Sequence, residues 1–418
     1  MEASCGWAPS ASHRAFANDP NLLPQGFKTT LKRREFLSGS VLLASGIAIS
    51  GLAMIGCRAA DEHPGDGSLA GGHLLDTVDF AGESGVQMDT PLEAELDGRL
   101  FFDLSALSAG EMVTPTDKFY IRTRASELLD LKRPWSIKLG GAKRPALVSA
   151  GELIETAEPV GLHLMECAGN ARGGNFGLIS VADWEGVQIS KMLDRVGIKN
   201  GRSRVLISGF DSYSSPSATS IPGASWVFSA DELSKSGAFI ATKMNRSALT
   251  PDHGAPVRLV VPGWYGCCCI KWVNEITSVD EDTAATSQMR EYATRTHQNG
   301  IPDFARDYEP AMIDPSAVPI RIERWKVNKR IRYKIIGIQW GGTQPAKSLL
   351  ISFDGGAEWH AVDKLYERAG DSWALWEHVW SPKNAGKYRI RLKVGDPTVR
   401  TRRLDKGYYD RAINIPSN

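Results

Sequence analysis

Short apolar runs separated by polar turn residues dominate the chain from about residue 96 to residue 300. Stretches with helical spacing of apolar residues are fewer, and two short ones stand out, at 149–155 and 189–196. The predicted strands in this region include residues 135–139, 160–166, 203–210 and 257–263. Because strands and helices do not alternate regularly, the pattern predicts an α+β domain over residues 96–300 and disfavours a doubly wound parallel sheet.

The pattern changes at about residue 316, where short strands of alternating apolar and polar residues follow one another. Turn signals such as Asp354-Gly355-Gly356 separate them. The predicted strands are residues 320–327, 333–340, 348–356, 376–381 and 387–394. This part, 316–418, is predicted to be a β-sandwich of immunoglobulin type without a disulfide, and the proline-rich stretch 301–319 is the predicted boundary.

Composition narrows the functional classes. The 418 residues are 42% apolar and 23% charged, with a formal net charge of +1, so no global field would draw nucleic acid or a membrane, and any anion site must be local. The sequence has no GxGxxG after a strand, no Walker motif, no HExxH and no GxSxG, which gives little support to nucleotide folds and the common hydrolases. It also has no Cys-x-x-Cys-His, so no c-type haem is expected in this chain.

The N-terminal residues 1–57 read as a targeting segment. Arg33 and Arg34 precede a Phe-Leu pair and a mildly apolar run rich in glycine, serine and alanine, which resembles a twin-arginine export signal. A single membrane-spanning anchor is the alternative. The run ends at Cys57, which is either a lipid-anchor site or precedes an ordinary cleavage site. We therefore predict export to the periplasm, with residues 58–95 as a linker.

One cysteine raises a question of chemistry. Cys167 follows an apolar run and has no cysteine partner nearby, and His163 lies four residues before it. Three interpretations remain open from the residues alone. Cys167 could be a nucleophile paired with His163, an inert buried thiol, or a soft ligand to a metal whose other ligands come from elsewhere.

Three segments resemble the sulfite oxidase family of molybdenum enzymes. They are Met-Glu-Cys-Ala-Gly-Asn-Ala-Arg at 165–172, His-Gly-Ala-Pro-Val-Arg-Leu-Val-Val-Pro-Gly-Trp-Tyr-Gly at 253–266, and Ile-Lys-Trp at 270–272. Together with the C-terminal sandwich, they follow the family's order over roughly residues 95–418. The resemblance implies a molybdopterin cofactor, with Cys167 as the protein's ligand to molybdenum and the pterin supplying the other soft ligands.

The same resemblance implies roles for other residues, most of which would otherwise be taken as surface charges, turn residues or packing. The implied catalytic residues are Cys167, Arg122, Arg172 and Tyr292. The implied cofactor-binding residues are Tyr120, Arg122, Asp211, His253, Arg258, Cys269, Ile270 and Lys271. Arginine forks suit oxyanions and phosphate, and a neutral tyrosine can donate a hydrogen bond beside a metal.

The sequence also departs from the family pattern. Residues 122–124 read Arg-Thr-Arg where sulfite-oxidising members have Arg-Asn-His, and a pocket tryptophan after the cysteine motif has no counterpart. Phe176 is a candidate to fill that space, and Arg402 or Arg403 is a candidate for the family's C-terminal pocket arginine. The run Cys267-Cys268-Cys269 is interpreted as buried small side chains, because consecutive residues cannot all face one ion.

These observations predict an exported molybdopterin oxidoreductase that transfers an oxygen atom. Sulfite oxidation to sulfate is the leading candidate, with a small anionic substrate, a separate cytochrome c-like electron carrier and a homodimer. Reduction of sulfoxides, including oxidised methionine in proteins, would use an oxo-acceptor substrate and is one alternative. A non-catalytic binding or assembly subunit that retains the fold is another, and a Cys–His hydrolase is the most distant.

Overall fold

The computed structural model describes residues 69–83, 85–141, 143–198, 204–217, 220, 222–344 and 346–417. The predicted export segment, 1–57, lies outside these residues, and so does Cys57. None of the helices in the described ranges combines the length and the apolar character that crossing a bilayer requires.

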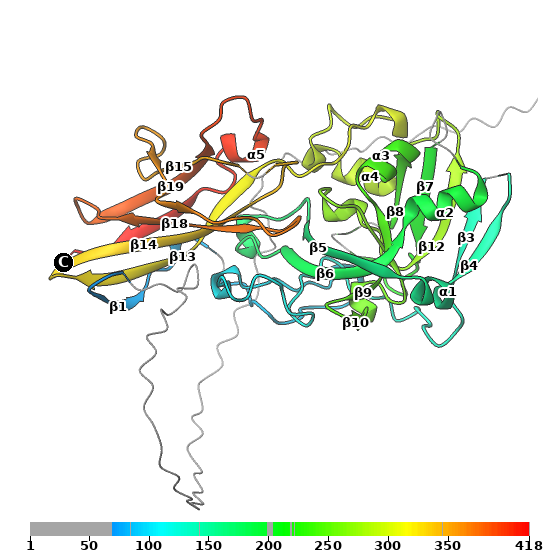
Figure 1. Ribbon diagram of the computed structural model, residues 1–418, viewed down its shortest axis with the longest axis horizontal. Helices are drawn as coiled ribbons and strands as arrows, with labels where there is room; N and C mark the ends of the chain where they lie inside the picture. Colours follow the sequence, from blue (N-terminus) through cyan, green and yellow to red (C-terminus); the bar gives the residue numbers. More distant parts are fainter. Residues whose placement is uncertain are drawn as a thin grey trace, which may run out of the picture. The chain divides into compact units, whose positions relative to one another are not determined.

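The first half of the described chain contains two five-stranded sheets (Figure 1). One sheet consists of β5 (Glu158–Glu166), β6 (Ile179–Gln188), β9 (Phe239–Met244), β10 (Ser247–Ala248) and β11 (Arg258–Val260). The other consists of β3 (Ser136–Gly140), β4 (Ala146–Ser149), β7 (Arg204–Gly209), β8 (Ser225–Ser229) and β12 (Val273–Val279). Only β12 with β3 is a parallel pair among them, which agrees with the predicted α+β class.

Four short helices accompany these sheets, and local side-chain chemistry sets their ends. They are α1 (Ala150–Glu155), α2 (Ile189–Val196), α3 (Ala230–Lys235) and α4 (Ser287–Tyr292). Ser229 and Glu232 form a capping box at the start of α3, which satisfies amide groups that the first helical turn leaves free. Gly197 ends α2 in the left-handed conformation that glycine adopts without steric cost.

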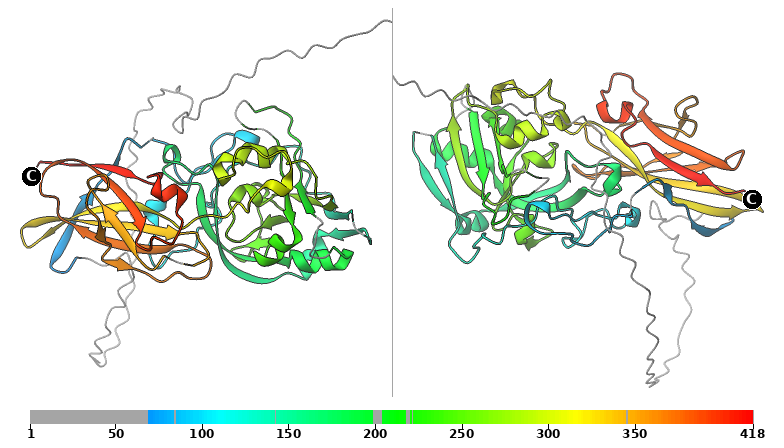
Figure 2. Two further views of the ribbon diagram at one scale, coloured as in Figure 1. Left: turned by 90° about the horizontal axis from the view of Figure 1, so that it is seen from above. Right: turned by 180° about the vertical axis from the view of Figure 1, so that it is seen from behind.

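The second half contains two further five-stranded sheets, in the orders β1-β13-β14-β18-β17 and β16-β15-β19-β20-β2. Figure 2 shows these two sheets as two layers. The rings of Phe353, at the end of β15, and Trp380, in β18, are stacked with their centroids 4.1 Å apart. The elements are β13 (Ser316–Val327), β14 (Arg330–Trp340), β15 (Leu349–Ser352), β16 (His360–Ala361), β17 (Lys364–Leu365), β18 (Ala374–Trp380), β19 (Gly386–Val394), α5 (Arg402–Asp405) and β20 (Arg411–Ile415).

The prediction that residues 58–95 form a linker is partly wrong. β1 (Gly72–Thr77) pairs with β13, and β2 (Phe80–Ala81) pairs with β20. The residues before the first domain therefore complete edges of both C-terminal sheets. The sequence pattern of these strands is weak because long-range pairing, and not their own burial, stabilises them; five of the six residues of β1 are exposed.

The core that positions the site is built around β5 and the segment between β11 and β12. β5 ends at Glu166, so the chain leaves the sheet directly before Cys167. The segment 261–272 connects β11 to β12, and Leu259 N–H binds the Ile270 carbonyl across it. Cys167, Cys269 and Ile270 are all less than 5% exposed. The end of β5 and the connection 261–272 thereby hold their polar groups within one buried region.

Candidate active site

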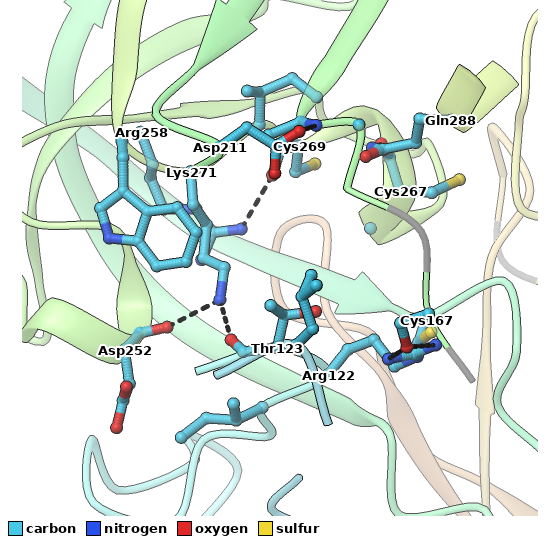
Figure 3. Close-up of a pocket in the computed structure, with 18 of the residues that line it drawn as sticks. Arg122, Thr123, Cys167, Asp211, Asp252, Arg258, Cys267, Cys269, Lys271 and Gln288 are labelled. Carbon is cyan, nitrogen blue, oxygen red and sulfur yellow. Dashed lines mark hydrogen bonds between the residues drawn. The ribbon is translucent and has the colours of Figure 1, made fainter. Parts of the chain in front are cut away.

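A pocket of about 900 Å³, including its open mouth, collects most of the predicted site residues (Figure 3). The predicted residues that line it are Tyr120, Arg122, Cys167, Asp211, His253, Arg258, Cys269, Ile270, Lys271 and Tyr292. They come from sequence positions up to 172 residues apart, so tertiary folding creates the site.

Cys167 lies in the wall of this pocket and is 3% exposed. Its amide binds the Leu178 carbonyl, and its Sγ accepts a hydrogen bond from the Gly169 amide at 3.3 Å. Burial raises the pKa of the thiol, while the Arg122 guanidinium, the Gly169 amide and Arg295 act in the opposite direction. A cation bound beside Cys167 would therefore favour the thiolate, because it would displace the proton of the thiol.

Asn170 explains why the residues after Cys167 turn tightly. Its Oδ1 accepts a hydrogen bond from the Leu178 amide at 3.0 Å, and its Nδ2 donates to Glu166 at 3.3 Å. The side chain is fully buried and has partners at both ends. It therefore holds the two sides of the cysteine loop together and limits where the thiol can point.

Glu166 is a buried carboxylate directly before the cysteine. Trp340 Nε1 donates to it at 2.8 Å and the Tyr409 hydroxyl donates at 3.0 Å, both from the C-terminal half of the chain. Arg403 lies 3.7 Å away and donates to the Ala168 carbonyl at 2.7 Å. Burial raises the pKa of Glu166, and the Arg403 cation opposes that shift. The C-terminal half thus supports the cysteine loop on two sides.

This support predicts a large effect of Arg403 on stability. Arg403→Met should lower the free energy of unfolding by about 3–5 kcal/mol, because it leaves Glu166 buried without its cation. The free energy of unfolding would be measured in urea. Arg290→Met is the matched control, since Arg290 and Asp303 form an exposed pair and its loss should cost about 1 kcal/mol or less. Equal losses in both variants would contradict the predicted role.

Arg258, which is buried, and Lys271, which is half-buried, place two cations at another part of the pocket. Lys271 Nζ donates to the carbonyls of Asp252, at 2.9 Å, and Thr123. Arg258 donates to the carbonyls of His253 at 3.1 Å and Cys269 at 3.2 Å. Burial, reinforced by the Arg258 cation, lowers the pKa of Lys271 well below its ordinary value. An anion bound here would offset that cost.

His253 is positioned by two hydrogen bonds. Its Nε2 lies 3.0 Å from the Phe119 carbonyl, and its Nδ1 lies 2.7 Å from the Thr250 hydroxyl. A carbonyl only accepts, so Nε2 carries the proton and Nδ1 of the neutral ring accepts from Thr250. Gly254, at φ +103°, follows, and a Cβ there would lie 3.0 Å from Arg258 Cβ. His253 thus serves as a buried neutral ring, and Gly254 allows the tight turn that follows it.

The buried imidazole predicts a pH dependence of stability. Burial lowers the pKa of His253 to about 4 from an ordinary 6.5, so the unfolded chain binds the proton first as pH falls. Stability should decrease from pH 6.5 down to about pH 4, by up to about 1.4 kcal/mol per pH unit for this residue. His253→Gln should flatten the profile in urea unfolding measured at pH 7 and pH 4.5. An unchanged slope would contradict this assignment.

Residues 125–287 match the family model described as oxidoreductase molybdopterin binding domain. Mitochondrial sulfite oxidase of Drosophila melanogaster is 25% identical over 330 residues, which is 72% of this chain and 56% of that protein. Nitrate reductase [NADH] 1 of Arabidopsis thaliana is 31% identical over 195 residues, which is 41% of this chain and 20% of that protein.

Residues 125–287 are thus a molybdopterin-binding oxidoreductase domain, and a longer part of the chain is similar to mitochondrial sulfite oxidases. The matches span about half the length, or less, of the first curated relatives. The crystal structure of the sulfane dehydrogenase SoxCD from Paracoccus pantotrophus shares the fold, with a TM-score of 0.57 and 19% identity. That comparison covers 86% of this chain and 95% of the solved one.

The pocket fits the cofactor that the molybdopterin-binding domain implies. The Nε of Arg258 is buried without a hydrogen-bond partner in the described part of the chain. Within the same residues, neither Lys271 nor Arg258 forms an ion pair with a carboxylate, so both cations can receive the phosphate of a molybdopterin. Cys167 offers a thiol to the metal from another part of the wall. Asp211 lines the pocket, where its carboxylate can bind the pterin ring.

The structure corrects four sequence-based assignments. Arg172 is not among the pocket residues; it donates to the Asp410 carbonyl beside β20. Phe176 is fully buried against Tyr409 and does not fill the pocket. Arg402 forms an ion pair with Asp314. His163 lies 3.5 Å from Asp371 and has no hydrogen bond to Cys167, which removes the support for a Cys–His nucleophile.

The sequence analysis missed one residue that lines the pocket, Gln288, and two arginines that contact pocket residues, Arg99 and Arg295. Arg99 donates to the Arg122 carbonyl at 2.5 Å, and both guanidinium groups contact the Ser220 hydroxyl. Gln288 lines the wall on α4. The guanidinium of Arg295 lies over the Tyr292 ring at 5.4 Å. None belongs to a contiguous motif, although the spacing Tyr292-x-x-Arg295 places both side chains near one helix end and could have signalled the pair.

Proposed function

We propose that this chain catalyses the two-electron oxidation of a small sulfur oxyanion, with sulfite as the leading substrate. The observation that carries the proposal is the placement of Cys167, Arg122 and Tyr292 in one pocket with Lys271 and Arg258, two cations that form no ion pair within the described part of the chain. A cofactor anchored by its phosphate at the cations and by the thiol at its metal end would leave Arg122 and Tyr292 to face the substrate.

The reaction adds one oxygen atom to sulfite and releases two electrons; water supplies the oxygen, and two protons leave. When bound, the molybdenum cofactor would transfer the oxygen atom and accept both electrons. Arg122 attracts the anion, and Arg99 fixes the backbone that carries Arg122. Burial raises the pKa of Tyr292, so its neutral hydroxyl can donate a hydrogen bond to an oxygen of the substrate. Electrons would then leave singly to a cytochrome c-like carrier.

The decisive experiment uses the full chain matured in a host that makes molybdopterin. Molybdenum would be measured by elemental analysis, and reduction of cytochrome c would be assayed with sulfite on the same sample. Stoichiometric molybdenum with sulfite-dependent turnover is expected. Protein without molybdenum would overturn the proposal in favour of a non-catalytic subunit. Protein with molybdenum but without sulfite turnover would overturn sulfite as substrate; thiosulfate and sulfoxides would then be assayed.

The remaining assignments are part of the same proposal. Residues 1–57 would direct the folded protein to the periplasm by the twin-arginine route, with Cys57 as a lipid anchor. The two C-terminal layers would form an immunoglobulin-like unit that pairs two chains into a homodimer. Antiparallel pairing between the strands of both sheets supports an immunoglobulin-like sandwich.

A further inference from the structure

The hairpin formed by β13 and β14 ends in a dense cluster of positive charge. Between Arg324 and Arg332 the sequence reads Arg-Trp-Lys-Val-Asn-Lys-Arg-Ile-Arg, with five cationic residues and no acidic one. The turn at Asn328 and Lys329, both at positive φ, places these side chains at the end of the hairpin. The chain as a whole carries a net charge of only +1, so this excess is local.

Most of this charge is uncompensated. Arg324 is paired with Asp76 at 2.8 Å. The side chains of Lys326, Lys329, Arg330 and Arg332 are exposed, and no ion pair to them is found in the described ranges. Ser381 and Ser417 line a shallow hollow beside the last three, and no acidic residue does. We define these four exposed cations as the basic tip.

The described chain begins next to the basic tip. Gly72 pairs with Val327 in the first register position between β1 and β13, so everything before residue 69 joins the protein at this end. Residues 58–68 separate Cys57 from that point. Eleven residues span at most about 40 Å when fully extended. A membrane attachment at or before Cys57 would therefore keep the basic tip close to the bilayer.

We propose that the basic tip is a docking surface for the anionic headgroups of a lipid bilayer. The proposal rests on the predicted export segment and does not depend on the substrate of the pocket. A cluster of basic residues is a common second attachment beside a lipid anchor. Each lysine or arginine held near an anionic surface strengthens binding several-fold.

The position of the tip disfavours an electron carrier as its partner. Trp340, at the other end of β14, contacts Glu166 beside the cysteine loop. Arg330 starts the same strand, ten residues earlier, which corresponds to about 33 Å along β14. None of the residues that line the pocket belongs to this hairpin. A redox protein at the tip would be separated from the pocket by the length of the strand.

Vesicle flotation of the full chain tests the proposal. Binding would be compared on vesicles of phosphatidylglycerol with phosphatidylcholine and on phosphatidylcholine alone. The triple variant Lys329→Gln, Arg330→Gln, Arg332→Gln should bind the anionic vesicles on the order of 100-fold more weakly than the parent. The matched control Lys132→Gln, Lys143→Gln, Arg144→Gln removes three exposed cations from around β3 and β4 and should bind as the parent does.

Three outcomes overturn the proposal. They are equal vesicle binding by the triple variant and the parent, equal weakening by the control variant, and a difference that persists in 1 M salt, where charges are screened within about 3 Å. Turnover of the triple variant, measured on the same preparations, should equal that of the parent. Failure of the sulfite assay would therefore leave the vesicle result interpretable, and the reverse also holds.

Discussion

Cys167→Ser is expected to reduce substrate-dependent turnover by more than about 100-fold while most of the pterin stays bound. The thiol is the soft donor that faces the pocket from the end of β5, and a serine hydroxyl is a much harder and less acidic ligand. Removing a group that hydrogen-bonds to a metal ligand typically lowers metal affinity or activity about 10–100-fold. Removing the ligand itself should therefore lower turnover by more than that. Turnover, molybdenum content and pterin content would be measured on the same preparation.

Cys268→Ala is the matched control for that experiment. Cys268 is a fully buried thiol, like Cys167, but it does not line the pocket. Its loss should leave turnover near the parent value, with a modest decrease in stability from the small cavity. Full turnover in Cys167→Ser would remove the metal-ligand role. A collapse of turnover in both variants would show that packing, and not ligation, limits the enzyme.

Lys271→Met should weaken retention of the pterin on the order of 100-fold. The methionine keeps the apolar stem and removes the charge that would pair with the phosphate, and truncating one partner of a buried charge pair costs about 2–5 kcal/mol. The pterin released on denaturation would be quantified by fluorescence after purification. Circular dichroism of the variant should match the parent, because the pocket cation is not part of a described ion pair.

Lys243→Met is the control for Lys271→Met. Lys243 lies on β9 in the same domain and pairs with Glu185 at 2.6 Å, away from the pocket lining. It should retain pterin as the parent does. If both lysine variants lost pterin equally, or if Lys271→Met lost none, the phosphate would have to bind elsewhere in the pocket.

Strands with strong local patterns were predicted close to their observed positions. The predicted run 160–166 lies within β5, and the helix predicted at 189–196 coincides with α2. In contrast, the ten residues of β6 include buried polar and small side chains such as Ser180 and Ala182, so they lack a clear period of two. β6 is defined by pairing with β5 on one side and β9 on the other, which local periodicity does not report.

The start of the C-terminal unit is predicted at residue 316, and β13 begins at Ser316. Its first strand is predicted only from residue 320, because the preceding stretch is rich in proline. Pro319 is accommodated where the register with β14 shifts, and proline is tolerated at such irregular positions. Likewise, β1 and β2 lie in a stretch predicted to be a linker because their partners, β13 and β20, are more than 200 residues away.

The family resemblance carried by contiguous motifs predicted the cofactor class and ten residues that line the pocket, because a thiol loop and a His-Gly-x-Pro-x-Arg segment carry their function locally. Tertiary structure decided which arginines serve the site. Arg172 turns to the Asp410 carbonyl, whereas Arg99 and Arg403 reach Arg122 and Ala168 from distant segments. A guanidinium is directed by whichever acceptors the fold places within its reach, and those acceptors are set by long-range packing that no local pattern records.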